Sequence, residues 1–375
     1  MPPGLARFGL RVAMLSAVLH AYIGWRLLPA LPIGAIGQWI GIGLLAGSAV
    51  MLPLGMFARF MVTRPALADL LTWVGALAMG LFSSTLVLTF LRDIALIPVS
   101  SMPIRQASAV LAPALALLIT VVGFANARRL PRVVDVEIPL AGLPTALAGF
   151  SIVQLSDIHV GATIKADYVR AVVERVNGLH ADLVAITGDL VDGSVDRLAA
   201  EVAPLGTLKS RHGTYVVTGN HEYYSGAGPW LAEFRRLGLH VLANSHRVIE
   251  HDGKRLVVAG VNDFSAGYFD PDQRSDPRAA LAGSPDGLPR ILLAHQPRSA
   301  GAADEAGFDL QLSGHTHGGQ FWPWNHLVRL QQPYTAGLHR LNHLWVYTSR
   351  GTGYWGPPKR FGAPSEITRI RLIHA

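Results

Sequence analysis

The sequence predicts a bundle of N-terminal transmembrane helices followed by a layered α/β domain. Of its 375 residues 50% are hydrophobic, and the mean hydropathy of +0.32 is too high for an ordinary soluble chain. The apolar residues gather in four spans before Arg128, whereas strands and helices alternate after Val133. We therefore expect a membrane anchor domain over residues 1–130 and a second domain over residues 131–375.

The four apolar spans are each close to the ~20 residues that a helix needs to cross a bilayer. They cover about 8–30, about 33–57, about 66–91 and about 106–126. In the first span, Arg11 and Arg26 leave only Val12 to Trp25 uninterrupted, a length that also suits a signal-peptide core. Because more apolar spans follow at once, we favour an uncleaved helix.

Charge is divided unevenly between the two parts. Through Arg132 the chain carries ten arginines, no lysine and two acidic residues, whereas the remainder carries 22 basic and 23 acidic residues. The basic residues therefore flank the apolar spans, so they indicate membrane orientation, and no nucleic-acid partner is expected. Asp69 and Asp93 are the only acids there, which favours an anchor over a transport pathway.

The arginines also predict which side of the membrane each terminus occupies. With four crossings, seven arginines fall on one side (Arg7, Arg11, Arg59, Arg64, Arg128, Arg129, Arg132) and three on the other (Arg26, Arg92, Arg105). The positive-inside rule then predicts an integral protein of the inner or plasma membrane with both its N-terminus and its second domain in the cytoplasm. If the first span does not cross, the N-terminus lies on the opposite side.

The second domain begins with an alternating edge strand at Val133 to Ile138. Strands are then expected at 151–156, 183–187 and 215–218, separated by helices at 166–177, 196–205 and 229–237. Further strands are expected around Val241 and Val248 and at 256–261, 291–294, 310–312, 345–348 and 367–372. A βαβα half followed by a strand-rich half indicates a layered α/β domain large enough for a substantial core.

Polar residues follow five of these strands, where open α/β sheets place their sites. The blocks are Asp157-Ile158-His159, Gly188-Asp189-Leu190-Val191-Asp192, Gly219-Asn220-His221-Glu222, His295, and Gly314-His315-Thr316-His317. Residues i and i+2 of an extended stretch project to the same side, so Asp157 and His159 can bind one metal. The chain has no cysteine, which excludes thiolate sites and cysteine nucleophiles.

Each block has a purely structural alternative when taken alone. Asp189 could cap a helix, Asn220 could form a turn, and His295 could be a core histidine with its hydrogen bonds satisfied. His-x-His pairs are mostly solvated loop residues. Five blocks in this order, each ending a strand, favour one shared metal site.

At these five blocks the chain resembles the calcineurin-like metallophosphoesterase superfamily, whose pattern is DxH, GDxxD, GNHE, a His, and GHxH. The similarity covers about residues 133–375, and it departs from the pattern at Ala294, where the family has Gly. It implies a metallophosphoesterase-type β-sandwich flanked by helices. It also implies two divalent ions, and the mixed nitrogen and oxygen donors suit Mn, Fe or Zn.

The resemblance further implies a role for each residue. Asp157, His159 and His317 would bind one ion, Asn220, His295 and His315 the other, and Asp189 would bridge them. His221 would act catalytically on the scissile phosphate or the leaving oxygen. Asp192 and Glu222 would orient a histidine or the backbone behind these ligands.

The segment from Arg350 to Gly362 is rich in Gly, aromatic and basic residues. It looks like the closing segment of the membrane-anchored bacterial branch, which includes enzymes resembling UDP-2,3-diacylglucosamine pyrophosphatases. Arg350 and Arg360 would then bind substrate, although a buried connection to the last strand explains the segment equally well. Phe321-Trp322-Pro323-Trp324 could face lipid or simply pack.

These expectations combine into a membrane-anchored, two-metal phosphoesterase acting on phosphodiester or pyrophosphate bonds, with a lipid-linked substrate and membrane lipid as partners. One alternative is a phosphomonoesterase or nucleotide phosphodiesterase that the anchor only localises. Another is a non-catalytic membrane scaffold with structural metals, against which His221 and the full ligand set argue.

Overall fold

The structure is a computed structural model that describes residues 3–375 and contains two compact units. The first comprises the chain up to Arg128 together with Trp355–Phe361. The second comprises Arg129–Tyr354 and Gly362–Ala375. The division near Arg128 lies beside the expected boundary, but the sequence did not indicate that Trp355–Phe361 would pack with the N-terminal helices.

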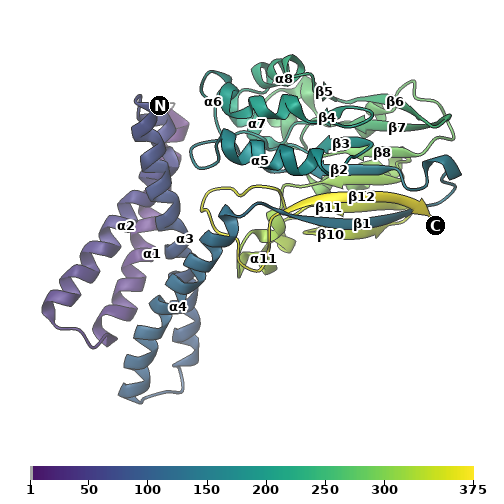
Figure 1. Cartoon of the computed structure of the whole chain (residues 1–375). Coiled ribbons are helices and arrows are strands. Elements are labelled where there is room, and N and C mark those ends of the chain that lie inside the picture. The colour runs from purple at the N-terminus through teal and green to yellow at the C-terminus, as the bar shows by residue number, and fades with distance from the viewer. Residues whose placement is uncertain (1–2) are drawn as a thin grey trace. The chain divides into compact units, whose positions relative to one another are not determined.

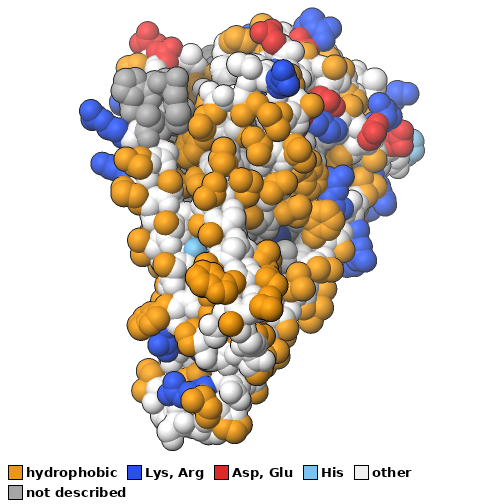
Figure 2. Space-filling model, turned by 90° about the vertical axis from the view of Figure 1, so that its left-hand side faces the viewer, with side chains coloured by type: hydrophobic (Ala, Val, Ile, Leu, Met, Phe, Trp, Pro, Cys, Tyr) orange, Lys and Arg blue, Asp and Glu red, His pale blue; other side chains and the backbone are white. Residues whose placement is uncertain are grey.

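Four helices form the first unit, as the apolar spans predicted (Figure 1). They are α1 (Pro3–Leu27), α2 (Ala35–Met61), α3 (Pro65–Ala95) and α4 (Met102–Arg128). Each is long and apolar enough to cross a membrane. Their outer faces carry exposed hydrophobic side chains such as Ile36, Trp39 and Leu44 (Figure 2). Such surface is stable in lipid and costly in water.

Small residues and polar pairs hold these helices together. A Cβ on Gly55 of α2 would lie only 2.7 Å from Gly75 Cα of α3, so the two backbones meet where neither residue has a side chain. Asp93 accepts hydrogen bonds from Tyr22 Oη at 2.6 Å and Arg26 Nε at 2.7 Å, which joins α1 to the end of α3. The acid that the sequence placed beside Arg92 is thus a structural partner of α1.

Two six-stranded sheets form the second unit (Figure 1). The first has the order β1-β12-β2-β3-β4-β5, with β1 Arg132–Leu140, β12 Glu366–His374, β2 Ser151–Leu155, β3 Leu183–Ile186, β4 Thr214–Val216 and β5 His240–Val241. The second has the order β10-β11-β9-β8-β7-β6, with β10 Gly337–Leu341, β11 Leu344–Thr348, β9 Leu310–Ser313, β8 Arg290–Leu293, β7 Lys254–Gly260 and β6 Ser245–His251. The expected two-sheet α/β architecture is confirmed.

The last strand closes the first sheet. β12 lies between β1 and β2, parallel to β1 and antiparallel to β2. β1 is consequently the edge strand that its alternating pattern predicted. The strands β2, β3 and β4 run parallel, as do β7, β8, β9 and β11, so their carboxyl ends meet at one edge of each sheet.

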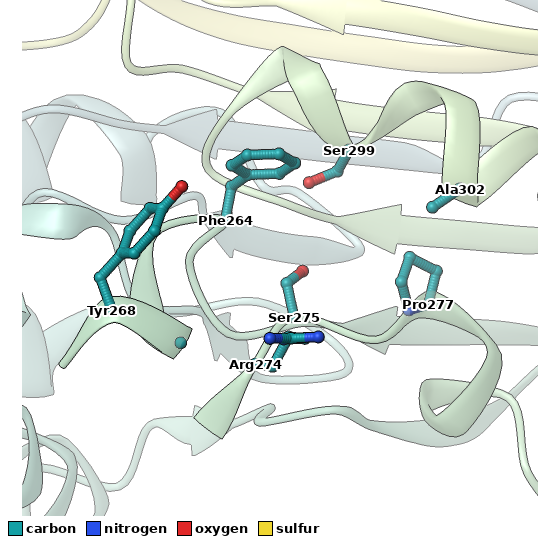
Figure 3. A pocket seen from close by; sticks show the side chains of 8 residues that line it. Phe264, Tyr268, Arg274, Ser275, Pro277, Ser299 and Ala302 are labelled. Carbon is teal, nitrogen blue, oxygen red and sulfur yellow. The ribbon is translucent and has the colours of Figure 1, made fainter. Parts of the chain in front are cut away.

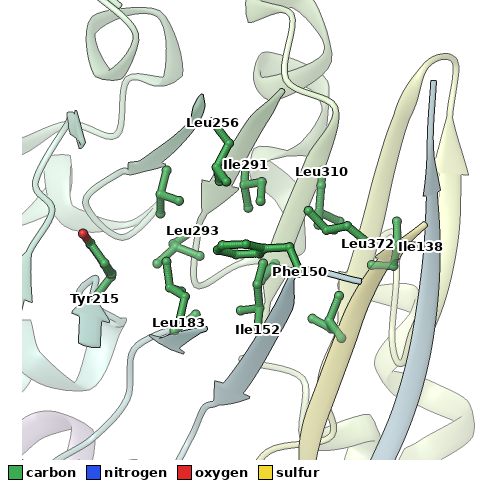
Figure 4. Packing of buried hydrophobic residues seen from close by; sticks show 14 of the residues in the cluster. Ile138, Phe150, Ile152, Leu183, Tyr215, Leu256, Ile291, Leu293, Leu310 and Leu372 are labelled. Atoms are coloured by element: carbon green, nitrogen blue, oxygen red, sulfur yellow. The ribbon is translucent and has the colours of Figure 1, made fainter. Parts of the chain in front are cut away.

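The core of this unit lies between the two sheets (Figure 4). Ile152 and Leu183 of the first sheet and Ile291 and Leu310 of the second are all fully buried. Helices flank the sheets: α5 (Ala166–Asn177), α6 (Val195–Val202), α7 (Asn220–Ser225), α8 (Ala227–Arg236), α9 (Pro277–Ala280), α10 (Ala300–Ala306) and α11 (Trp324–Leu327). In α5 the buried valines recur at the spacing of one helical face, at 169, 172, 173 and 176.

Candidate metal centre

The predicted ligands follow the carboxyl ends of five strands. Asp157 and His159 follow β2, Asp189 follows β3, and Asn220 follows β4 and begins α7. His295 follows β8, and His315 and His317 follow β9. The Asp and His residues among them form three overlapping groups that could each hold a metal ion: Asp157, His159 and His317; His159, Asp189 and His221; and Asp189, His295 and His315.

The first group joins the ends of β2 and β9. His317 Nε2 lies 3.0 Å from His159 Nε2 and 3.4 Å from Asp157 Oδ1. His159 Nε2 also lies 3.8 Å from Asp189 Oδ2. Three donor atoms from two distant parts of the chain therefore lie close together.

The third group, Asp189, His295 and His315, joins the ends of β3, β8 and β9. His295 Nε2 lies 3.1 Å from Asp189 Oδ2, and His315 Nδ1 lies 3.2 Å from His295 Nε2. The Asp189 carboxylate thus faces donors of the first and the third group. This is the position that a bridging carboxylate requires.

Hydrogen bonds behind the site fix two of the imidazole tautomers. His159 Nδ1 is 3.1 Å from Asp192 Oδ1, and His295 Nδ1 is 2.7 Å from the Thr187 carbonyl oxygen. A carboxylate and a carbonyl can only accept, so both Nδ1 atoms carry the proton. Each ring therefore turns its Nε2 towards Asp189, at 3.8 Å for His159 and 3.1 Å for His295, which is how a metal-binding histidine is oriented.

The backbone at these residues is in an uncommon conformation. Asp157, His159, Asp189, His315 and His317 all have positive φ, between 52° and 69°. L residues with side chains visit this region rarely, and such strain collects at functional sites. No pattern in the sequence predicted these backbone conformations.

Two glycines in the sequence blocks allow the loops to approach one another. A Cβ at Gly188 would lie 2.5 Å from the Gly219 nitrogen, and one at Gly314 would lie 2.2 Å from Asp157 Oδ2. A side chain at either position would push two of the ligand loops apart. The glycines of the blocks are therefore needed for contact between the strand ends.

Glu222 lies behind the loops rather than among the metal donors. Its carboxylate accepts the backbone N–H groups of Gly219 at 2.6 Å, Leu190 at 2.7 Å and Asp189 at 3.0 Å. It therefore ties the loop after β3 to the loop after β4. This contact pattern agrees with the expectation that Glu222 orients the backbone.

Neighbouring charges and burial shift the pKa values of Asp189, His221 and His315. Burial raises the pKa of Asp189, but the neighbouring His295 and His221 outweigh this and hold it well below its usual range. Burial lowers the pKa of His221, yet the carboxylates of Asp189 and Asp192 raise it to about 9. Burial and the charge of His295 lower the pKa of His315 to about 3, which keeps that imidazole neutral and able to bind metal.

The donor set fits divalent cations. Asn220 Oδ1 is buried and has no hydrogen-bond partner among the described residues. A buried amide oxygen without a partner is costly, and a cation at this place would satisfy it. Carboxylate, amide and imidazole donors together suit first-row divalent metals.

The two predicted substrate-binding arginines lie in different units. Arg350 belongs to the second unit, where its Nη1 lies 2.9 Å from Glu366 Oε2 and its Cγ borders Gly318 of the His-x-His turn. Arg360 belongs to the helical unit, is 1% exposed, and donates its backbone N–H to Gly123 O. The structure thus brings Arg350 beside the turn but does not group Arg360 with the metal donors.

Sequence reasoning missed Asp263 and Gln296. The buried Asp263 carboxylate accepts from Gln296 Nε2 at 3.1 Å and 3.2 Å, next to the predicted ligand His295. Asp263 N also donates to Thr218 Oγ1 at 3.2 Å, just before the loop that carries Asn220. Asp263 follows β7 as the other site residues follow their strands, so the strand-end pattern could have found it.

Two facing sheets with acidic, amide and imidazole side chains at their strand ends define an α/β protein built to hold divalent metal. Residues 150–319 match the calcineurin-like phosphoesterase family. An uncharacterised metallophosphoesterase of Aquifex aeolicus is 32% identical over 223 residues, which cover 59% of this chain and 84% of the relative. The chain belongs to this metallophosphoesterase family, and the resemblance seen in the sequence blocks is confirmed.

Two further relatives extend the comparison. A transmembrane protein with metallophosphoesterase domain from Danio rerio is 42% identical over 273 residues, or 70% of this chain. An uncharacterised metallophosphoesterase of Helicobacter pylori is 41% identical over 256 residues, or 67% of this chain. The match spans 62% of the length of the first and 66% of the second. With its four apolar helices, the chain is a membrane protein of this family.

Proposed function

We propose that this chain is a membrane-anchored phosphoesterase with two divalent cations that hydrolyses phosphodiester or pyrophosphate bonds. The observation that carries the proposal is the position of Asp189, whose carboxylate faces His159 at 3.8 Å and His295 at 3.1 Å. One carboxylate between two sets of donors suits a pair of cations better than a single structural ion.

In this proposal each donor has one task. Asp157, His159 and His317 would hold one cation, Asn220, His295 and His315 would hold the other, and Asp189 would serve both. Such cations would supply an activated water near neutral pH and would offset the charge of the phosphoryl oxygens. Mn, Fe and Zn all suit the donor set.

His221 supplies the remaining chemistry. Its Nδ1 donates to Asp192 Oδ1 at 2.5 Å, so its Nε2 is the atom presented to a substrate. The Asp192 carboxylate favours the protonated ring, so Nε2 can donate to a phosphoryl oxygen or protonate the leaving oxygen.

Proximity to lipid supports a lipid-linked substrate, with membrane lipid as a second partner. The anchor confines the site to the neighbourhood of a bilayer, and Trp324, seven residues after His317, is 42% exposed. Exposed tryptophan is common where proteins meet the lipid interface. The arginine distribution around the helices supports a cytoplasmic location for the second unit.

The test uses the full-length protein in detergent, stripped of metal and reloaded separately with Mn, Fe or Zn. Hydrolysis is measured on a soluble monoester, a soluble diester, a pyrophosphate and a lipid-linked diester. We expect metal-dependent cleavage of the diester or pyrophosphate, and His221→Ala should lower kcat about 10²–10⁴-fold. His343→Ala, which removes a half-exposed histidine elsewhere, is the control.

Each other outcome has a definite meaning. Cleavage of the monoester alone would replace our substrate class with a phosphomonoesterase. Equal cleavage of soluble and lipid-linked diesters would remove the lipid part of the proposal. If His221→Ala bound metal but kept full activity, the assigned role of His221 would be wrong. A protein that binds metal and cleaves nothing would be a scaffold.

A further inference from the structure

A pocket of about 300 Å³ opens beside the metal centre within the second unit. It is lined by Phe264, Gly267, Tyr268, Arg274, Ser275, Pro277, Ser299 and Ala302 (Figure 3). None of these residues is a metal donor or belongs to the five sequence blocks. The pocket is therefore a separate feature that the hydrolytic chemistry does not explain.

Two serine hydroxyls at this pocket lack a hydrogen-bond partner among the described residues. They are the buried hydroxyls of Ser275 and Ser299. Ser299 as a whole is only 3% exposed. In Figure 3 both hydroxyls point into the space between Phe264 and Pro277. Buried hydroxyls without partners are uncommon in folded proteins and point to a ligand that completes them.

The charge and the walls of the pocket indicate what that ligand is. Arg274 lines it with a guanidinium group, and neither an acidic side chain nor any other charged residue contributes to the lining. A guanidinium and two hydroxyl donors suit an anionic group such as a phosphate or a carboxylate. Phe264, Tyr268 and Pro277 supply apolar walls, and the Tyr268 ring, 89% exposed, is open to solvent. The pocket thus suits an anion carried on an apolar body.

The pocket walls are tied to the sheet that carries the metal donors. Asn244 donates from Nδ2 to Arg274 O at 2.8 Å, and its Oδ1 accepts from Asp276 N at 3.0 Å. Asn262 donates from Nδ2 to Gln273 O at 3.0 Å. These bonds fix the segment that bears Arg274 and Ser275, so the pocket is already formed without a ligand.

Contacts on two sides join this pocket to the metal centre. Phe264 directly follows Asp263, whose carboxylate holds Gln296 beside the donor His295. On the other side, the Phe269 ring lies 5.6 Å from the Tyr224 ring, which in turn lies 5.2 Å from the ring of His221. The residues that line the pocket and those of the metal centre thus share neighbours on both sides.

We infer that this pocket is a substrate subsite that binds a second anionic group of the substrate, carried on an apolar body. This group belongs to the part of the substrate that stays bonded to phosphorus when the leaving group departs. The inference rests on the proposed hydrolytic function. Arg274, Ser275 and Ser299 bind the anion, and Phe264 and Tyr268 contact the apolar part. The subsite gives a preference for substrates that carry two anionic groups.

The experiment compares 4-nitrophenyl phenyl phosphate with 4-nitrophenyl 4-carboxyphenyl phosphate on the metal-loaded, full-length protein. Both release the same leaving group, so any difference comes from the carboxylate. We expect the wild type to prefer the carboxylated substrate in kcat/KM, and Arg274→Gln to reduce that preference about tenfold. Arg278→Gln removes the same charge from an arginine that pairs with Glu305 and does not line the pocket, and it should keep the preference.

A second variant separates ligand binding from folding. Because Ser299 Oγ has no partner, Ser299→Ala should leave the melting temperature unchanged or raise it, while reducing the preference for the carboxylated substrate. A wild type without any preference, or an Arg274→Gln variant that retains it, overturns the subsite while hydrolysis itself stands. Failure of the wild type to cleave either diester counts against the proposed function instead. In that case, binding of 4-carboxyphenyl phosphate to the metal-free protein tests the pocket alone. Binding that Arg274→Gln weakens and Arg278→Gln does not would still support the subsite.

Discussion

Asp192 Oδ1 accepts a hydrogen bond from His221 Nδ1 at 2.5 Å, and the same oxygen also accepts from His159 Nδ1 at 3.1 Å. One carboxylate oxygen therefore orients both a proposed catalytic residue and a proposed metal ligand. Asp192→Asn keeps the shape but removes the charge, and we expect kcat to fall about 10–100-fold. Steady-state kinetics with parallel metal analysis checks this, and Asp196→Asn at an exposed position of α6 is the control. Full activity in Asp192→Asn would contradict the orienting role.

The two histidines of the His-x-His turn face different groups of donors. His315 Nδ1 lies beside His295, whereas His317 Nε2 lies beside His159. We expect about two metal ions per wild-type chain, and about one in either His315→Ala or His317→Ala. Mass spectrometric metal analysis of protein purified at a fixed free-metal concentration measures this number. If the double variant still retained one ion per chain, the two histidines would share a single metal.

Glu222 holds three backbone N–H groups of two ligand loops. Glu222→Ala leaves these donors without an acceptor in a buried place, and we expect it to destabilise the fold by about 3 kcal/mol or more. Thermal unfolding followed by circular dichroism in detergent measures the loss. Glu174→Ala on the exposed face of α5 should change stability by less than about 0.5 kcal/mol. Equal effects of the two variants would show that the three contacts contribute little.

Lys359 is fully buried within the helical unit. Its Nζ donates to Gly80 O at 2.8 Å, Ser84 Oγ at 2.5 Å and Thr120 Oγ1 at 3.0 Å. We expect Lys359→Ala to loosen Trp355–Phe361 from α3 and α4, because a buried cavity replaces three hydrogen bonds.

Hydrogen exchange measures this loosening at the Arg360 amide, which donates to Gly123 O at 2.8 Å. Its exchange should accelerate about tenfold or more in Lys359→Ala. Lys209→Ala, at an exposed position of the second unit, should leave it unchanged. An unchanged rate in Lys359→Ala would mean that the lysine does not hold the segment.

The absence of cysteine makes the membrane orientation directly testable. Thr63→Cys lies between α2 and α3, and Ser100→Cys lies between α3 and α4. The arginine distribution predicts that a membrane-impermeant maleimide added to intact cells labels Ser100→Cys and not Thr63→Cys. Labelling after permeabilisation shows that both thiols are reactive. The reverse pattern would place the second unit outside the cytoplasm.

Much of this architecture could be predicted from local patterns. The four membrane helices follow from uninterrupted apolar length, since only a helix satisfies its own backbone in lipid. The strands β2, β3 and β4 were found because their apolar runs lead into Ser-Asp, Gly-Asp and Gly-Asn. Smaller elements such as α7, β10 and α10 were missed, since short segments carry too few residues for periodicity to show.

Parts of the site depended on contacts that local patterns do not contain. The strand-end pattern could have pointed to Asp263, but its contact with Gln296, 33 residues away, appears in no local pattern. Arg360 lies in Trp355–Phe361, a C-terminal segment that packs with the N-terminal helices. Its proposed role in substrate binding therefore stays a prediction.

The sequence by itself determined the order of the chain, its membrane anchor and the residue types that can hold metal. Those features depend on composition and on neighbours within a few positions, where periodicity and residue chemistry act directly. Only the tertiary structure decided that β12 lies between β1 and β2, that Asp189 faces two sets of donors, and that unpartnered serines surround a pocket beside them. These features arise when distant segments pack together, and the geometry of that packing is not written in any single stretch of residues.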